Sequence, residues 1–356
     1  MKLVHVFPSF ARGGQQMRLA ALVGGLGEEF RHRVISLDGE MSAREAFAPK
    51  AIEVETFIAK KSSGVSLSNI RGLAERIRGA NILCTYNFGS LEAAIANRFG
   101  PRLPHLHFED GFGPDESLMK QKAKRMLMRR LVLAKSVVVV PSHGLEALAK
   151  ERWGLKRVRR IANGIDIARF ASAARALRDG APIVGSVGAL RPEKNYRRLI
   201  AAFSNAGGDA KLVIHGEGPE RESLAAAASE YKVALDLPGQ TNTPEAALAA
   251  IDIFALSSDT EQMPLSLMEA MASGLPVIST DVGDVKQMVC EENREFITPL
   301  GEDDAYAKAL RRLISDAPLR ARLGAANAAK ARAEFALDRM VADYRTLYNA
   351  ALEGAW

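Results

Sequence analysis

The chain has 356 residues, which is long for one hydrophobic core and sufficient for two, because domains cluster around 100–200 residues. Its composition, 47% hydrophobic and 25% charged, is that of a soluble globular protein, and no apolar run approaches the roughly 18–20 residues of a membrane span. The net charge of +6 is uneven: residues 1–170 hold 28 basic and 16 acidic residues, whereas residues 171–356 hold 20 and 26. The first half is therefore expected to meet an anionic partner.

The start of the chain, the two cysteines and the motifs of the first half indicate the cellular compartment and the kind of anionic partner. The apolar start of the chain is too short for a signal peptide, and Cys84 and Cys290 each lie in or beside an apolar stretch, as buried free thiols of the cytoplasm would. No helix-turn-helix, zinc-finger or aromatic stacking pattern favours nucleic acid. An acidic membrane surface is the better candidate, so we expect a cytoplasmic protein that is peripheral on the inner face of the membrane.

Short β-rich runs alternate with helix-length amphipathic segments, which predicts parallel sheets with helices on both faces. In the first half the predicted strands are Leu3–Phe7, Arg33–Leu37, Glu53–Ile58, Ile82–Thr85, His105–Phe108 and Ser136–Val140. In the second half they are Ile183–Val187, Lys211–His215, Val233–Leu237, Ile253–Leu256, Pro276–Thr280 and Glu295–Ile297. Between the halves, residues 171–180 hold no strand pattern and end in a breaker cluster. We therefore predict domains at 1–170 and 171–335, with a helical remainder at 336–356.

Two short motifs follow predicted first strands of the two halves. Gly13 and Gly14 open a helix, where glycine lets the backbone approach a ligand and the helix N-terminus offers N–H groups to phosphate; a plain tight turn is the alternative. Arg191 and Lys194 follow the strand Ile183–Val187, at the sheet edge where open α/β folds bind ligands. They suit phosphate oxygens, and solvated surface charge is the alternative.

The segment Glu261–Val277 is more specific. Glu261 lies just beyond a predicted strand, Pro264 suits the first turn of a helix, and Glu269 lies within that helix among apolar neighbours. A carboxylate in such surroundings needs a partner, and ribose hydroxyls are suitable ones. Leu265 continues the helix start beside Pro264.

The two glutamates eight positions apart, followed by Ala-Met-Ala-Ser-Gly-Leu-Pro-Val, resemble the retaining nucleotide-sugar glycosyltransferases of the GT-B fold, family four. The resemblance extends over nearly the whole chain. The other matching motifs are Gly13-Gly14, Asn163-Gly164-Ile165-Asp166, Arg191 with Lys194, and Gly216-Glu217-Gly218-Pro219.

The resemblance implies two Rossmann-like α/β domains facing across a cleft, with the last helix returning to the first domain. It implies that Arg191 and Lys194 hold the donor diphosphate, that Glu269 holds the ribose and that Glu261 lies beside the donor sugar. It also implies a front-face reaction with neither a cofactor nor a metal. The residues predicted to bind the donor are Gly13, Gly14, Arg191, Lys194, Gly216, Pro264, Leu265 and Glu269.

The chain departs from the family pattern at two places. Glu261 is followed by Gln262 where the family usually has glycine, which predicts a bulkier loop at the sugar site. The family also places a histidine after a first-domain strand, commonly before a glycine. Alignment on Gly111 puts Asp110 there, and alignment on the strand end suggests His107; both alternatives stay open.

Residues 105–116 hold two histidines and four carboxylates beside two glycines, which favours an active-site loop over a structural one or a metal site. We expect Asp110 or His107 to act on the acceptor together with Glu261 as the catalytic set. Glu109 and Asn163 are expected on the acceptor side.

The cations of the first half concentrate in residues 119–131, where Met119, Met126, Leu127 and Leu131 fall at helical spacing. A basic amphipathic helix of this kind either lies on an anionic bilayer or packs with a solvated basic face. The cations expected to face the membrane are Lys120, Lys122, Lys124, Arg125, Arg129 and Arg130.

Taken together, these patterns predict a retaining glycosyltransferase that moves a hexose from a nucleotide-diphosphate sugar to a lipid-linked saccharide or glycolipid of cell-surface polysaccharide or lipopolysaccharide assembly. A nucleotide-sugar epimerase on the same fold and a non-catalytic saccharide-binding protein are the alternatives. An NAD-dependent oxidoreductase is disfavoured, because neither glycine turn has the dinucleotide fingerprint.

Overall fold

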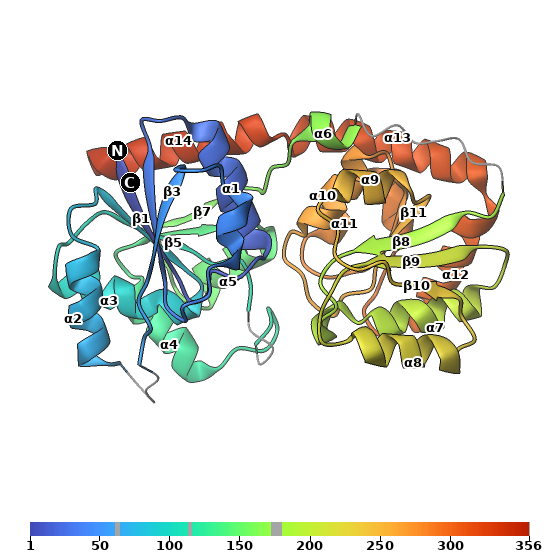
Figure 1. Ribbon diagram of the computed structural model, residues 1–356, viewed down its shortest axis with the longest axis horizontal. Coiled ribbons are helices and arrows are strands. Elements are labelled where there is room, and N and C mark those ends of the chain that lie inside the picture. The colour runs from blue at the N-terminus through green and yellow to red at the C-terminus, as the bar shows by residue number, and fades with distance from the viewer. Residues whose placement is uncertain (61–64, 113–115, 172–179, 356) are drawn as a thin grey trace. The chain divides into compact units, whose positions relative to one another are not determined.

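The computed structural model describes residues 1–60, 65–112, 116–171 and 180–355 (Figure 1). The chain forms two compact units. Unit 1 comprises Met1–Gly164 together with Leu337–Trp356, and unit 2 comprises Ile165–Ala336. The sequence analysis predicts that the second domain begins at residue 171, whereas unit 2 begins at Ile165. Residues 172–179 lie outside the described part of the chain.

Unit 1 is built on a seven-stranded sheet in the order β3-β2-β1-β4-β5-β6-β7, with every neighbouring pair parallel. This order places the first strand near the middle, as in nucleotide-binding folds, so the loops after β1 and β4 meet at one edge of the sheet. The strands are β1 Lys2–Phe7, β2 Arg31–Ser36, β3 Ile52–Thr56, β4 Ile82–Tyr86, β5 His105–Phe108, β6 Val137–Val140 and β7 Val158–Arg160. The helices are α1 Gly14–Leu26, α2 Leu67–Arg76, α3 Leu91–Phe99, α4 Ala123–Val132, α5 His143–Glu151 and α14 Leu337–Glu353.

Alternate residues of the unit 1 strands enter different cores, because successive side chains of a strand point to opposite faces. Leu3 and Phe7 of β1 pack with α1 and with α14, and Val4 and Val6 pack with α2 and α3. The last helix of the chain, α14, therefore completes the core of the unit that contains the first strand (Figure 1). Tyr344 of α14 stacks on Phe108 of β5 with 5.8 Å between ring centres.

Unit 2 has a six-stranded sheet in the order β10-β9-β8-β11-β12-β13, again parallel throughout. The strands are β8 Ile183–Val187, β9 Lys211–His215, β10 Leu235–Asp236, β11 Ile253–Leu256, β12 Val277–Thr280 and β13 Ile297–Thr298. The helices are α6 Ile167–Ala171, α7 Tyr196–Ala206, α8 Arg221–Glu230, α9 Pro244–Ala249, α10 Leu265–Ala272, α11 Val285–Met288, α12 Asp303–Ser315 and α13 Ala317–Glu334. One face of the sheet packs on α7, α8 and α12.

The structure confirms the predicted fold class of two Rossmann-like α/β domains, and eleven of the twelve predicted strands form with small shifts at their ends. The prediction of a strand at Glu295–Ile297 is wrong, because Glu291–Phe296 forms a 3-10 helix and β13 begins only at Ile297. The sequence analysis missed β7, because this edge strand has three residues and two of them are exposed arginines. Cys84 and Cys290 are buried free thiols, as predicted. None of the helices in the described ranges combines the length and apolar character that crossing a bilayer demands.

The predicted basic helix at 119–131 is wrong at its start, since α4 begins at Ala123. Arg129 does not belong to its solvated face: the side chain is 1% exposed and ion-paired inside unit 1. Met126 packs against an apolar cluster, whereas Leu127 and Leu131 are both 56% exposed.

Candidate active site

The loop after β8 in unit 2 carries the predicted phosphate residues. A single 3-10 turn over Pro192–Lys194 follows Arg191, and Asn195 then adopts the left-handed conformation with φ 43° before α7 begins. The Asn195 side chain accepts a hydrogen bond from the Arg198 backbone N–H at 3.2 Å and so caps α7. Lys194 is therefore held between two fixed turns.

Lys194 and Glu261 form an ion pair between the loop after β8 and the loop after β11. Burial alone would lower the pKa of Lys194, but the Glu261 carboxylate outweighs it and the pKa is raised. Ser258 also donates a hydrogen bond to Glu261 at 2.8 Å. Arg191, in contrast, is 53% exposed at the side chain. An ammonium has three donors, so Lys194 can keep Glu261 and still bind an anion.

The loop that carries Glu261 is braced by the segment before α11. Gly283 has φ +57°, and a Cβ there would lie 2.5 Å from the Glu261 carbonyl oxygen and 2.6 Å from that of Gln262. Asp284 N–H donates to the Gln262 carbonyl at 2.9 Å. Gln262 itself is 6% exposed. The Gln262 side chain is therefore buried, and the bulkier loop at the sugar site stays a prediction.

Glu269 lies on α10, which begins after Pro264 with Leu265. Burial raises the pKa of Glu269 to about 7; the charge of Arg169 lowers it and that of Glu245 raises it. Arg169 is itself committed to Glu245, with hydrogen bonds of 3.0 and 2.7 Å. Among the residues that the structure describes, none donates a hydrogen bond to the Glu269 carboxylate. It is a half-buried acceptor that is available to hydroxyl groups.

Gly216 is required by backbone packing within unit 2. A Cβ at this position would collide with the Gly188 carbonyl oxygen, because the loops after β8 and β9 meet there. Gly188 N–H donates to the His215 carbonyl at 2.9 Å. The glycine thus brings the two loops at the carboxyl edge of the sheet together.

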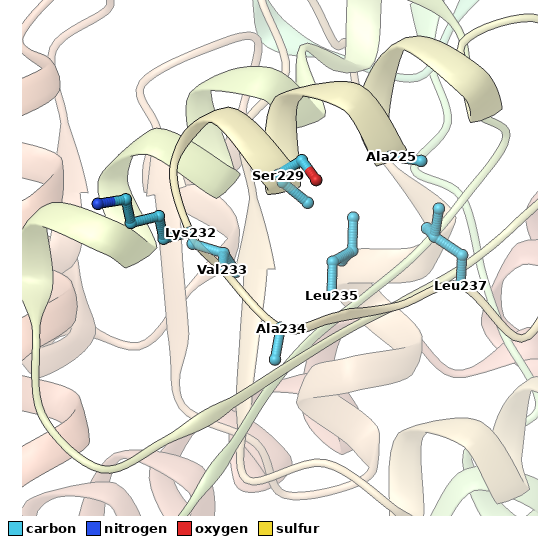
Figure 2. Close-up of a pocket in the computed structure, with 8 residues that line it drawn as sticks. Ala225, Ser229, Lys232, Val233, Ala234, Leu235 and Leu237 are labelled. Atoms are coloured by element: carbon cyan, nitrogen blue, oxygen red, sulfur yellow. The ribbon is translucent and has the colours of Figure 1, made fainter.

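The predicted donor residues lie apart from the pocket between α8 and β10. Its lining residues are Ala225, Ala228, Ser229, Lys232, Val233, Ala234, Leu235 and Leu237 (Figure 2). No predicted site residue is among them, and we give this pocket no role in donor binding.

In unit 1 the glycine loop opens α1, whose first turns carry two polar side chains toward Asp110. Gly13 is extended, with φ −166°, so its backbone conformation does not require glycine. Gln15 donates a hydrogen bond to Asp110 at 2.8 Å, and Arg18 donates one to each Asp110 carboxylate oxygen. Arg18 also donates to Asn163 at 3.1 Å.

Asp110 is 12% exposed at the side chain and fixed at its backbone as well. Its N–H donates to the Asn87 side-chain oxygen at 2.9 Å. Asn87 has φ 51°, an uncommon conformation for a residue other than glycine and one that is found at functional sites. Burial would lower the pKa of Arg18, but the nearby Asp110 carboxylate outweighs this effect, and the pKa of Arg18 is raised.

His107 and Glu109 are both completely buried. The His107 ring is hydrogen-bonded to Thr85 at 2.8 Å and to Glu109 at 3.2 Å. Neither side chain has surface to offer an acceptor, so the geometry favours Asp110 over His107 and does not support Glu109 as an acceptor contact. Asn163, at 8% exposure, meets Arg18 rather than solvent. Asp115 lies outside the described residues, and within them no three metal-ligating side chains cluster.

Comparison with known proteins matches two family models to successive parts of the chain. "Glycosyltransferase Family 4" matches residues 12–169, and "Glycosyl transferases group 1" matches residues 169–330. The chain belongs to glycosyltransferase family 4. The two models meet near the boundary between units 1 and 2.

The curated relatives are similar in sequence to only part of this chain. A GDP-mannose-dependent alpha-mannosyltransferase of Mycobacterium tuberculosis is 38% identical over 156 residues, which are 42% of this chain and 40% of that protein. The lipopolysaccharide core biosynthesis glycosyltransferase LpsE of Rhizobium meliloti is 27% identical over 191 residues, 52% of this chain and 56% of that protein. The matched regions thus span about half the length of these two relatives.

Among solved structures, the HepE protein of Anabaena in complex with UDP and glucose superposes with a TM-score of 0.85. It covers 98% of this family 4 chain and 100% of its own, at 19% identity. The likeness shows the shared GT-B fold.

The sequence analysis of this family 4 chain missed Arg18, the partner of Asp110. The available signal was a cation one helical turn beyond the glycine loop, on the same helix that Gly14 opens. Nothing in the sequence linked it to a residue 92 positions away.

Proposed function

We propose that this chain is a retaining glycosyltransferase that moves a hexose from a nucleoside-diphosphate sugar to a lipid-linked saccharide or glycolipid. One observation carries the proposal: the half-buried Glu269 carboxylate has a pKa near 7 and no hydrogen-bond donor among the described residues, on the helix that follows the Lys194–Glu261 pair. Two vicinal ribose hydroxyls would satisfy that acceptor, because a buried polar group without a partner is costly.

The donor diphosphate would be bound by Arg191 and Lys194. Its charge grows as the bond to the sugar breaks, and cations placed there stabilise the leaving group. Lys194 would stay fixed by Glu261, which would itself lie beside the sugar. Since these cations can neutralise the diphosphate, we expect transfer to persist in the presence of EDTA.

On the acceptor side, Asp110 would accept a hydrogen bond from the attacking hydroxyl and orient it. The two hydrogen bonds from Arg18 fix this carboxylate in place, which suits an orienting role. In a front-face reaction, a leaving phosphate oxygen would take the proton of that hydroxyl.

A lipid-bearing acceptor is supported by the surface of α4 and the segment before it, which we call the basic patch: Lys120, Lys122, Lys124, Leu127, Arg130 and Leu131. All of these side chains are exposed. Such a mixture of cations and exposed leucines suits the face of an acidic bilayer. We propose that the protein works as a peripheral protein on the inner face of the cytoplasmic membrane, in cell-surface polysaccharide or lipopolysaccharide assembly.

A panel of GDP- and UDP-hexoses tests this proposal. One nucleotide sugar should raise the unfolding temperature, since a ligand at 100 times its Kd adds about 2.7 kcal/mol. With an acceptor lipid extract, the same sugar should be transferred with its anomeric configuration retained. Isomerisation of the nucleotide sugar without acceptor would indicate an epimerase, and saccharide binding without any nucleotide binding would indicate a non-catalytic protein.

A further inference from the structure

Arg129 of α4 is a cation enclosed by aromatic rings. Its guanidinium lies 5.0 Å from the ring centre of Phe88, 5.6 Å from that of Phe112 and 4.7 Å from that of Trp153. The side chain is 1% exposed. A flat guanidinium can stack on such rings, whereas an ammonium presents only a point charge.

The same guanidinium binds two buried carboxylates. It donates to Glu109 at 3.2 and 3.3 Å and to Glu116 at 3.3, 3.4 and 3.5 Å. Arg125, which is 31% exposed, adds a second cation to Glu116 at 3.1 Å. Two cations therefore face two carboxylates, and Arg129 is the one that reaches both.

A buried ion cluster of this kind is weak evidence of a role in stability. Removing ions from water costs several kcal/mol for each ion, and apolar residues of similar volume often serve stability equally well. The cluster does connect directly to Asp110: Glu109 precedes it in the chain, and Phe112 follows two residues later. Glu109 N–H is in turn bound to the Val139 carbonyl of β6 at 3.0 Å.

We infer that Arg129 is a positioning residue for Asp110. By binding Glu109 and Phe112, on either side of Asp110, it fixes the backbone from which the Asp110 carboxylate meets Arg18 and Gln15. The inference rests on the role proposed above for Asp110 in orienting the acceptor. Arg129 acts from inside unit 1 and touches no substrate, so its loss should impair turnover rather than donor binding.

The variant that tests this is Arg129→Lys, which keeps the charge and loses the planar fork. It should lower kcat for transfer about 10–100-fold, because a misplacement of about 1 Å can cost two orders of magnitude. The Kd of the nucleotide should stay within about twofold. Arg76→Lys on α2 is the matched control: it makes the same chemical change at an arginine whose guanidinium also lies over an aromatic ring, that of Phe57 at 4.6 Å, and its kcat should stay near wild type. Equal kcat values for the two variants would overturn the inference.

A second control, Leu73→Ala on α2, distinguishes the positioning of Asp110 from a general loss of stability. This core side chain is fully buried, so its truncation leaves a cavity and should clearly lower the urea concentration at the midpoint of unfolding. At a temperature well below unfolding, its kcat should nevertheless match wild type. If Leu73→Ala loses kcat as Arg129→Lys does, general destabilisation explains the effect and the inference fails.

Two measurements that do not depend on enzymatic activity, tryptophan emission and amide hydrogen exchange, test the positioning role separately from the proposed function. In a Trp356→Phe background Trp153 is the single tryptophan, and Arg129→Lys should change its emission. Amide hydrogen exchange in a peptide that contains Asp110–Phe112 should accelerate, while that of α1 should not. Unchanged emission and exchange would overturn the positioning role even in an active enzyme. If the wild type fails to transfer any sugar, the proposed function fails, and faster exchange in Arg129→Lys still supports the positioning of Asp110.

Discussion

Arg18 donates a hydrogen bond to each oxygen of the Asp110 carboxylate, which joins the first helix of the chain to the loop after β5. A bidentate pair of this kind fixes both the position and the orientation of the carboxylate. Asp110 is therefore suited to orienting a hydroxyl group.

The first prediction follows from this pair. Asp110→Asn should lower kcat for sugar transfer by about 100-fold or more, because the amide no longer offers two acceptor oxygens to Arg18 and the substrate. Nucleotide binding by calorimetry should be unchanged. His107→Gln, at a fully buried position, should cost less activity than Asp110→Asn. The reverse ranking would return the role to His107.

The second prediction concerns the phosphate residues. Arg191→Ala and Lys194→Ala should each weaken nucleotide-sugar binding by about 1.5–3 kcal/mol, or roughly 10–100-fold in Kd, because a charge-assisted hydrogen bond is lost. Arg197→Ala removes a neighbouring exposed cation that is paired with Glu230 and should leave the Kd within about twofold. Calorimetry gives all three values. Wild-type affinity in Arg191→Ala would refute its phosphate contact.

The third prediction is that the Glu269 carboxylate lowers the free energy of unfolding and strengthens binding of the nucleotide sugar. The pKa of this carboxyl is raised to about 7, so the folded state holds a proton that the unfolded state releases above about pH 4.5. The group therefore costs stability as the pH rises from about 4.5 to 7. At pH 8, Glu269→Gln should raise the free energy of unfolding by on the order of 1–3 kcal/mol, measured by urea denaturation.

The same variant should bind the nucleotide sugar more weakly, since a neutral amide is a poorer partner for ribose hydroxyls than a carboxylate. In the wild type, affinity should rise with pH between about 6 and 8, as Glu269 loses its proton, and Glu269→Gln should abolish that rise. A stabilised variant with unchanged affinity would show that Glu269 does not contact the donor.

The sequence indicated the parts of the candidate site that depend on local motifs. Glu261 and Glu269 lie on one loop and helix, and Arg191 and Lys194 on one turn, so their spacing already indicated their chemistry. The roles of Arg18 and Arg129 could not be predicted from the sequence, because their partners Asp110 and Glu109 come from other segments of the chain. The order of strands in the sheet brings these segments together. Arg129 even looked like surface charge, since five other cations surround it in residues 119–131.

The fourth prediction is a loss of stability in mild acid. Burial lowers the pKa of His32 to about 4 and that of His105 to about 3, and it lowers the pKa of His5 well below 6.5. Because these folded-state values lie below the unfolded value, the unfolded state binds more protons and stability falls as the pH drops below about 6.5. Each histidine should cost about 1.4 kcal/mol at pH 5.5, or about 4 kcal/mol in total.

Urea unfolding at pH 7.5 and pH 5.5 measures this loss. His5 and His32 are hydrogen-bonded to each other at 3.0 Å, so His32→Asn removes one titrating ring and should reduce the pH-dependent loss by about a third. An unfolding free energy that is equal at the two pH values would contradict the prediction.

The last prediction is that unit 1 binds acidic membranes through the basic patch. Each Lys or Arg near an anionic surface contributes about 1 kcal/mol, and this attraction fades within a Debye length of about 8–10 Å at physiological salt. Leu127 and Leu131, each 56% exposed, would add apolar burial. Liposome co-sedimentation should therefore show binding to vesicles with anionic lipid, no binding to neutral vesicles, and release as salt rises to several hundred millimolar.

A double variant locates this binding on α4. Lys124→Ala with Arg130→Ala should lower the partition coefficient by about 2 kcal/mol, on the order of 30-fold. Lys2→Ala with Arg31→Ala removes two exposed cations from β1 and β2 instead, and should have a much smaller effect. Both double variants carry the same net charge, so a difference between them reports position rather than total charge. Equal losses would indicate diffuse attraction, and no binding to anionic vesicles even at low salt would favour an acceptor without a lipid.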